Sequence, residues 1–96
     1  MYARVTSIRF PRSMKVEVVG VARGLGPILS QQRGFEALQV LMDPHAGEGI
    51  IVSMWETVAH AEASEASASY IGQMSMMSSF LCERIAPQTY EVSVRA

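Results

Sequence analysis

The side chains that could meet a small molecule lie at the end of one predicted strand and in the helical region after it. Trp55 closes an apolar run, and its indole ring could stack on a flat ligand and donate one hydrogen bond. His60, five residues later, could serve as a general acid or base because an imidazole titrates near neutral pH. The commoner roles are core packing for such a tryptophan and solvent exposure for such a histidine. We therefore treat Trp55 and His60 as candidate catalytic residues without an assigned reaction.

A second group of candidates follows helical spacing further along the chain. Tyr70, Met74 and Met77 recur at intervals of four and three residues, which places them on one face of a helix. Methionine adapts to irregular apolar ligands, and the tyrosine hydroxyl could orient one. Together with Trp55, these three residues are the predicted binding site for a small apolar ligand. The alternative is that the methionines fill the core and the hydroxyl of Tyr70 reaches solvent.

Several other kinds of site are disfavoured by spacing and charge. No cluster of His, Cys, Asp and Glu has the spacing of metal ligands, so we predict no metal site. The glycine-rich segment 24–27 has neither the GxGxxG nor the GxxxxGK spacing of a phosphate-binding loop, and we expect no cofactor. The net charge is −1 and basic residues form no run, so no nucleic-acid partner is expected. No segment approaches the ~20 apolar residues of a membrane span, so no membrane partner is expected either.

Cysteine usage and the N-terminus bear on the compartment. Cys82 is the single cysteine of the 96 residues, so one chain cannot form a disulfide, and the reducing cytoplasm is the expected location. The first residues are expected to form a strand and do not have the pattern of a signal peptide. Cys82 stands in an apolar stretch expected to be helical, which predicts a buried, unreactive thiol.

Hydrophobic periodicity changes several times along the chain. Alternating or β-branched runs predict strands at 2–9, 35–43, 48–56 and 88–95. Spacings of three and four residues predict a helix over 14–25 with a short second piece at 28–32, followed by helical stretches over 58–69 and 70–85. The order is β-α-β-β-α-β. We therefore predict one α+β domain over residues 1–96, with a ferredoxin-like fold and a four-stranded antiparallel sheet covered by helices on one face.

The two middle strands are apolar on both faces. In 48–56, Ile50, Val52 and Met54 point one way while Ile51 and Trp55 point the other. An antiparallel sheet with two apolar faces is usually covered on both. The chain has helices enough for one face, so we expect a second copy of the chain to cover the other in a homodimer.

Charges on the first and fourth predicted strands leave two alternatives open. Arg4 and Arg95 would need a carboxylate if the dimer buried them, and Glu91 is the candidate partner. Otherwise, both arginines lie at exposed positions.

The run Gly34-Phe35-Glu36-Ala37-Leu38-Gln39-Val40-Leu41-Met42-Asp43, then Gly47, then Ile51-Val52-Ser53-Met54-Trp55-Glu56-Thr57, is typical of one family. It resembles the antibiotic-biosynthesis monooxygenase-like members of the dimeric α/β-barrel superfamily. The resemblance implies the ferredoxin-like fold and a dimer that forms an α/β barrel. It also implies a cofactor-independent monooxygenase acting on a small, flat, apolar molecule such as a quinone or polyketide. A non-catalytic ligand-binding or regulatory dimer with the same pocket is the alternative.

Overall fold

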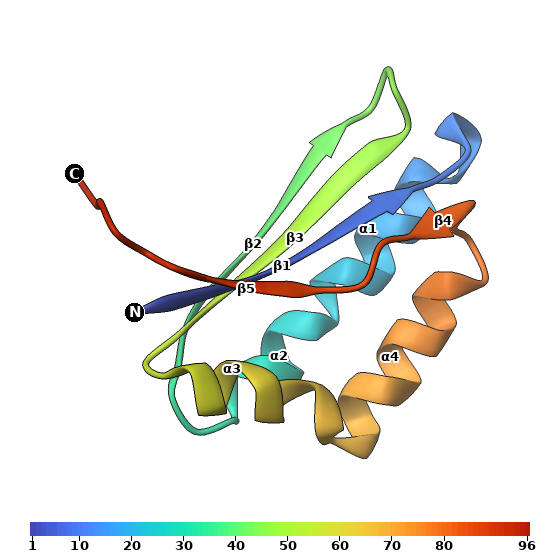
Figure 1. Ribbon diagram of the computed structural model, residues 1–96. Coiled ribbons are helices and arrows are strands. Elements are labelled where there is room, and N and C mark those ends of the chain that lie inside the picture. The colour runs from blue at the N-terminus through green and yellow to red at the C-terminus, as the bar shows by residue number, and fades with distance from the viewer.

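The computed structural model describes all residues from 1 to 96. Its five strands form one sheet, and its helices pack together on one side of that sheet (Figure 1). The elements in chain order are β1 (Tyr2–Arg9), η1 (Arg12–Met14), α1 (Lys15–Arg23), α2 (Leu25–Ser30), β2 (Phe35–Asp43), β3 (Glu48–Trp55), α3 (Val58–Ala63), η2 (Ser64–Ala66), α4 (Ala68–Ser78), β4 (Glu83–Arg84) and β5 (Gln88–Glu91).

The sheet is antiparallel throughout, with β1 at its centre. Strand order is β2-β3-β1-β4, and β5 pairs with the same edge of β1 as β4 does, further along the strand. β1 and β3 pair over their whole lengths, from Tyr2 opposite Trp55 to Arg9 opposite Glu48. This arrangement confirms the predicted α+β, ferredoxin-like fold with its helices on one face.

Alternation along the strands sends one set of side chains toward the helices. On β3, Ile51, Ser53 and Trp55 are buried on that side, while Ile50 is 40% exposed on the opposite, open face. A β-bulge between Phe35 and Ala37 interrupts the alternation of β2. Simple alternation would place Phe35 on the face of Leu41, which is open, but the extra residue turns the Phe35 ring back toward the core.

The core lies between the sheet and the helices. Eleven buried apolar residues form it, and they come from β1, the segment after it, α1, α2, β3, α3 and α4. At its centre, Trp55 is fully buried, and its ring meets the Phe35 ring edge-on with 5.6 Å between centroids. The Trp55 indole N–H donates to the Ser53 hydroxyl at 2.8 Å, so its polar atom is satisfied inside the protein.

One threonine and one serine cap the N-termini of the two α-helices that follow β3. The Thr57 hydroxyl accepts from the His60 backbone N–H at the start of α3, and the Ser67 hydroxyl accepts from the Tyr70 N–H at the start of α4. Each cap satisfies a backbone donor that the first turn of a helix leaves free. The helical region after β3 is thereby divided at Ser67, two or three residues before the predicted division.

The predicted end of the last helix is wrong. α4 ends at Ser78, and the chain then returns to the sheet, where the Cys82 N–H donates to the Arg9 carbonyl and the Ile85 N–H to the Ser7 carbonyl. The segment after Ser78 therefore pairs its backbone with free carbonyl groups of β1 and does not continue the helix that its apolar periodicity predicted. Cys82 consequently lies outside any helix and is exposed, which corrects its predicted burial.

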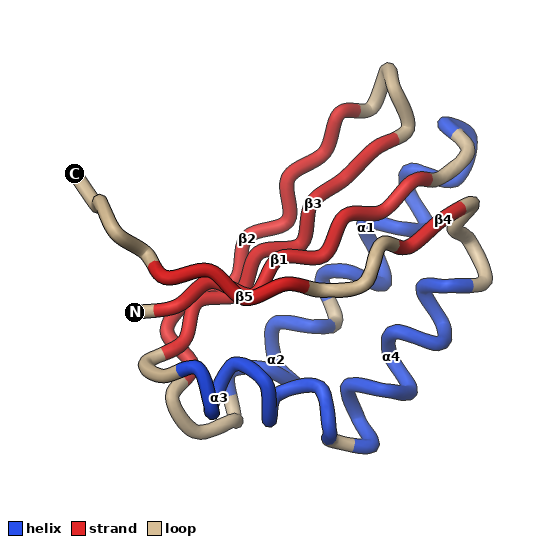
Figure 2. The backbone as a smooth tube through the Cα atoms, in the orientation of Figure 1, coloured by secondary structure: helices blue, strands red, loops and turns tan.

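The last strand also ends earlier than predicted. β5 stops at Glu91, because only the Val92 N–H finds a further partner, the Met1 carbonyl. The tail after it projects away from the sheet on the side opposite the helices (Figure 2), and Val94 is 88% exposed. None of the helices combines the length and apolar character needed to cross a membrane.

Candidate functional site

A cavity of about 440 Å³ opens between β1, α4 and the segment that carries β4. Its size lies within the ~300–1,000 Å³ typical of small-ligand pockets. The lining combines apolar side chains with hydroxyls and two charged groups: Thr6, Glu65, Tyr70, Ile71, Met74, Ser75, Ser78, Arg84 and Pro87.

Helical spacing presents one face of α4 to the cavity. Tyr70, Met74 and Ser78 follow one another at intervals of four residues, and Ile71 and Ser75 form the adjacent row. The opposite wall comes from the sheet. Thr6 is buried on the helix side of β1, and its hydroxyl is one of the polar groups beneath the cavity.

Glu65 of the cavity lining forms an ion pair with Arg4. The Arg4 guanidinium on β1 donates from Nε and from one terminal nitrogen to the two carboxylate oxygens of Glu65, both at 2.9 Å. Its other terminal nitrogen donates to the Thr89 hydroxyl on β5 at 2.7 Å. The hydrogen bonds to Glu65 raise the pKa of Arg4 above its ordinary value, against the opposing effect of burial. The fork thus ties β1, η2 and β5 together and occupies both oxygens of Glu65.

Tyr70 is half-buried beside this pair. Burial raises the pKa of the Tyr70 hydroxyl above its ordinary value, and the negative charge of Glu65 adds to the rise. Positive charge on Arg84 and Arg4 acts in the opposite direction. Tyr70 is therefore a neutral hydrogen-bond donor across the physiological pH range.

The predicted ligand-binding residues fall into two groups. Tyr70 and Met74 both line the cavity. Trp55 and Met77 are fully buried in the core and do not line it. A ligand in this cavity would therefore meet Tyr70 and Met74 directly, and Trp55 and Met77 would act only as support beneath it.

His60, the other candidate from the sequence, also lies away from the cavity. It packs against Gly34, whose backbone has φ of +82° and whose missing Cβ leaves room for the imidazole ring. Its Nδ1 atom is buried without a hydrogen-bond partner. This position suits a packing role at the junction of β2 and α3.

Sequence reasoning missed most of the polar lining. Arg4 was expected to seek Glu91 if buried, but its partner is Glu65, which stands in the small-residue segment 58–69 and gave no signal of its own. Arg84 was placed inside a helix and not in a strand facing the cavity. Ser75 and Ser78 could have been found, since they share the helical face of Tyr70 and Met74.

No group of three or more His, Cys, Asp or Glu side chains lies close enough together to hold a metal ion. Glu65, which lines the cavity, and Glu83, which adjoins Arg84 in sequence, are unsuited to that role in different ways. Glu65 is engaged by Arg4, and Glu83 lies on the opposite face of the sheet from Arg84, beside Arg9 in the strand register.

Comparison with known proteins finds similarity in structure alone. No family model and no curated protein matches the sequence. A candidate antibiotic biosynthesis monooxygenase from Nitrosomonas europaea superposes with a TM-score of 0.83 at 15% identity, covering 98% of this chain and 100% of that one. A candidate of the same description from Bordetella bronchiseptica gives a TM-score of 0.84 at 15% identity, with 97% of each chain covered.

A further solved structure has a stated activity. It is a variant of SnoaB, a cofactor-independent oxygenase from Streptomyces nogalater, and it gives a TM-score of 0.81 at 9% identity over 98% of this chain and 94% of that one. At identities this low, the superpositions establish the fold, and any activity has to be argued from the residues of this chain. The chain thus has the ferredoxin-like fold of the antibiotic biosynthesis monooxygenase-like proteins.

Proposed function

We propose that the protein is a cofactor-independent oxygenase that acts on a small, flat, largely apolar molecule bound in the cavity of α4. The observation that carries the proposal is the neutral Tyr70 hydroxyl beside the apolar side chains of Met74 and Ile71. Such a cavity offers a flat ring system two apolar contacts and one hydrogen bond to a ring oxygen. The fold shared with a cofactor-independent oxygenase adds support of a general kind.

In the proposed reaction the substrate itself supplies the electrons. An anthrone-type substrate has a methylene group whose C–H bond is acidic because the resulting charge spreads onto a carbonyl oxygen. Loss of that proton to water gives an enolate, whose carbon passes electrons to molecular oxygen and forms a C–O bond. The resulting peroxide anion takes a proton back from water and becomes a hydroperoxide. The remaining C–H proton is then lost as the O–O bond breaks and water leaves, so that CH₂ and O₂ become C=O and H₂O.

The chain's own residues would act on the first step. The Tyr70 hydroxyl would donate to the oxygen that becomes negative when the proton leaves, and this contact is stronger in the transition state than in the bound substrate. Met74 and Ile71 would hold the ring plane and exclude water from the reacting carbon. Both oxygens of Glu65 accept from Arg4, so no free carboxylate is available as a base and water at the cavity mouth takes the proton.

The test measures oxygen uptake with dithranol, a three-ring anthrone, after subtraction of the rate without protein. We expect protein-dependent uptake that falls on the order of 10²-fold in Tyr70→Phe, as when a hydrogen-bond donor to a developing oxyanion is removed. Tyr2→Phe is the matched control, because Tyr2 lies on the same face of β1 as Thr6 but does not line the cavity. Uptake that is absent, or equal in the two variants, would rule out the oxygenase.

One observation favours a second function, which is ligand binding without turnover. Glu65 is the one carboxylate that lines the cavity, and the Arg4 fork leaves it poorly placed to accept a proton. A binding protein would show a rise in melting temperature with dithranol under nitrogen, since a ligand stabilises the state it binds. The same protein would then consume no oxygen in air.

We also propose that the working form is a homodimer joined through the open face of the sheet. Leu41, Ile50 and Tyr90 are at least 40% exposed there, and Val5 and Val52 lie between them in the strand register. A second copy would bury this surface, and a two-fold axis would bring the same residues together from both chains.

A further inference from the structure

The position of Arg84 gives the cavity a positive charge that no other residue of the protein neutralises. Arg84 pairs with Ile8 in the β1–β4 register, and Ile8 is buried on the helix side of the sheet. Side chains of directly opposed residues share a face, so the guanidinium extends over the helix side, where it lines the cavity mouth beside α4. Its neighbour Glu83 points to the other face.

Charge balance inside the cavity depends on two ionised groups in its lining, Glu65 and Arg84. The carboxylate of Glu65 is neutralised by Arg4, in the one salt bridge that the structure contains. Arg84 forms no salt bridge and no side-chain hydrogen bond. The cavity therefore presents one uncompensated positive charge, which acts on the pKa of the Tyr70 hydroxyl in the direction opposite to Glu65.

We propose that the ligand of this cavity is a flat apolar carboxylic acid, whose carboxylate binds to Arg84 at the mouth while its rings lie inward against Met74 and Ile71. The inference rests on the proposed binding of a flat apolar molecule in this cavity and adds the charged group. A guanidinium binds a carboxylate through two parallel N–H donors, which fixes the direction of entry as well as the charge. Arg84 is exposed, so the carboxylate keeps part of its hydration and little desolvation opposes binding.

Burial distinguishes the Arg84 guanidinium from the Tyr70 hydroxyl. Tyr70 is half-buried and neutral, which suits a ring oxygen, whereas Arg84 lies in water and suits a permanent anion. The Ser75 hydroxyl lies along α4 within the same lining and adds a donor, whereas the Ser78 hydroxyl already donates to the Met74 carbonyl at 2.9 Å and can only accept. The expected substrate therefore carries an acid group as well as an oxygen on its ring system.

The experiment compares two ligands that differ only in charge, 2-naphthoate and 2-naphthamide, by titration calorimetry under nitrogen. We expect the naphthoate to bind at least ten-fold more tightly to the unaltered protein. Arg84→Gln should abolish this difference by weakening naphthoate binding more than amide binding, and Arg84→Lys should retain part of it because the charge remains without the fork. Arg12→Gln is the matched control, because Arg12 is exposed in η1 and does not line the cavity.

Each remaining outcome is decisive. Equal affinities for the two ligands, or a preference that survives in Arg84→Gln, would overturn the carboxylate site while leaving the apolar cavity in place. Failure of both ligands to bind would overturn the cavity as a binding site, and the carboxylate site with it. Oxygen plays no part in the measurement, so a negative result with dithranol in air does not bear on it. Unchanged melting temperatures of the Arg84 variants establish that they are folded.

Discussion

Tyr70 and Arg4 show how the ionisation of one residue is set by groups on other elements. The Tyr70 hydroxyl has its pKa raised by burial against the sheet and by the Glu65 carboxylate of η2. Arg4 has its pKa raised by hydrogen bonds to that same carboxylate. A single glutamate thus raises the pKa of both groups, and at Tyr70 it adds to the larger effect of burial.

The tyrosine can be tested by spectrophotometric titration. The protein has three tyrosines, and we expect the absorbance change of Tyr70 to come at a higher pH than its ordinary value of 10.0. Below that value the phenol is protonated both folded and unfolded, so it adds nothing to the pH dependence of stability. Above it the unfolded chain loses the proton first, and the free energy of unfolding falls as the pH rises. Tyr70→Phe should remove the late part of the titration, and an unaltered curve would contradict the assignment.

Removing the carboxylate that Arg4 binds should destabilise the protein. Glu65→Gln breaks a two-point, charge-assisted hydrogen bond between partly buried groups, so we expect the free energy of unfolding to fall by about 1.5–3 kcal/mol. Chemical denaturation at pH 7 measures this. Glu62→Gln is the control, since Glu62 is exposed on α3 and makes no salt bridge, and its effect should stay within about 0.5 kcal/mol. Equal effects of the two changes would show that the fork contributes nothing.

At this scale the sequence predicted what helical spacing encodes and missed what the tertiary fold brings together. Tyr70 and Met74 share a helical face, and that face lines the cavity. Glu65 and Arg4 are 61 positions apart, and no local pattern connects them. Trp55 was predicted from its type, and its type is equally suited to the core in which it lies.

Individual elements owe their ends to caps and to competition for backbone partners. The bounds of β1, β2 and β3 agree with the predicted strands to within a residue, because each has alternating apolar side chains and a turn at its ends. The region after Ser78 could not be predicted from periodicity, since its backbone pairs with β1 across a long sequence separation. Local pattern therefore gave β1, β2 and β3 and not the segment that returns to the sheet after Ser78.

Alanine substitutions at two glycines, one in a helix and one in a turn, should change the free energy of unfolding in opposite directions. In α4, Gly72 is exposed and a Cβ there would meet nothing within 4 Å, so Gly72→Ala should raise the free energy of unfolding by about 0.5–1 kcal/mol through helix propensity. Gly34 has φ of +82° and faces the His60 ring, so Gly34→Ala should lower it by about 2 kcal/mol or more. Melting temperatures compare the two variants directly. A stable Gly34→Ala would show that α3 can move away from β2.

The whole molecule is one sheet with helices on one side and an open apolar surface on the other (Figure 1). The sequence predicted this layering because both faces of β3 are apolar and helices remain for only one. The shape of the cavity could not be predicted, since it depends on where α4 ends and where β4 returns to the sheet.

The proposed dimer can be tested at the centre of the open face. Val52 lies between Val5 of β1 and Gln39 of β2, so Val52→Asp would place a charge in the middle of the contact. We expect sedimentation velocity to give a dimer for the unaltered chain and a monomer for this variant. Val16→Asp is the control, because Val16 is 78% exposed on α1, away from the open face, and should leave the dimer intact. A monomer before any substitution would contradict the dimer.

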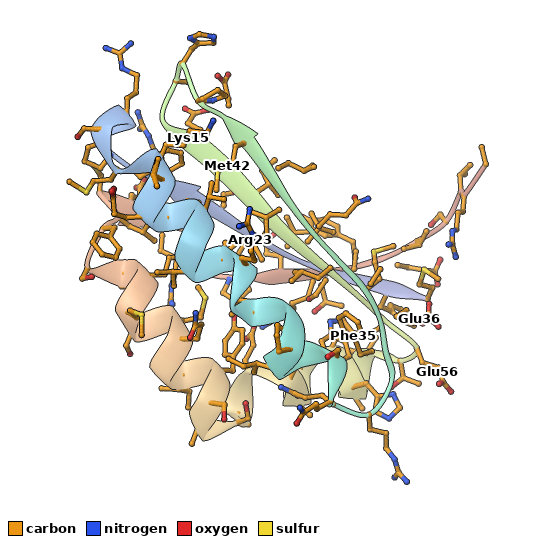
Figure 3. All side chains as sticks on the ribbon, turned by 180° about the vertical axis from the view of Figure 1, so that it is seen from behind. Lys15, Arg23, Phe35, Glu36, Met42 and Glu56 are labelled. Atoms are coloured by element: carbon orange, nitrogen blue, oxygen red, sulfur yellow. The ribbon has the colours of Figure 1, made fainter.

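The outer edge of β2 has no strand beside it, and this has a consequence for how the protein behaves when heated or stored. Its unpaired backbone groups border an apolar groove of about 200 Å³ between α1 and β2, lined in part by Val19, Leu38 and Val40. Figure 3 shows Lys15 and Arg23 on the adjacent helix and Glu36 at the bulge, three charges that stand along this border. Edges of this kind recruit extended chains from other molecules, and charges and bulges oppose that recruitment. Neutralising these residues should therefore favour pairing of β2 edges between molecules and make the protein more prone to aggregate.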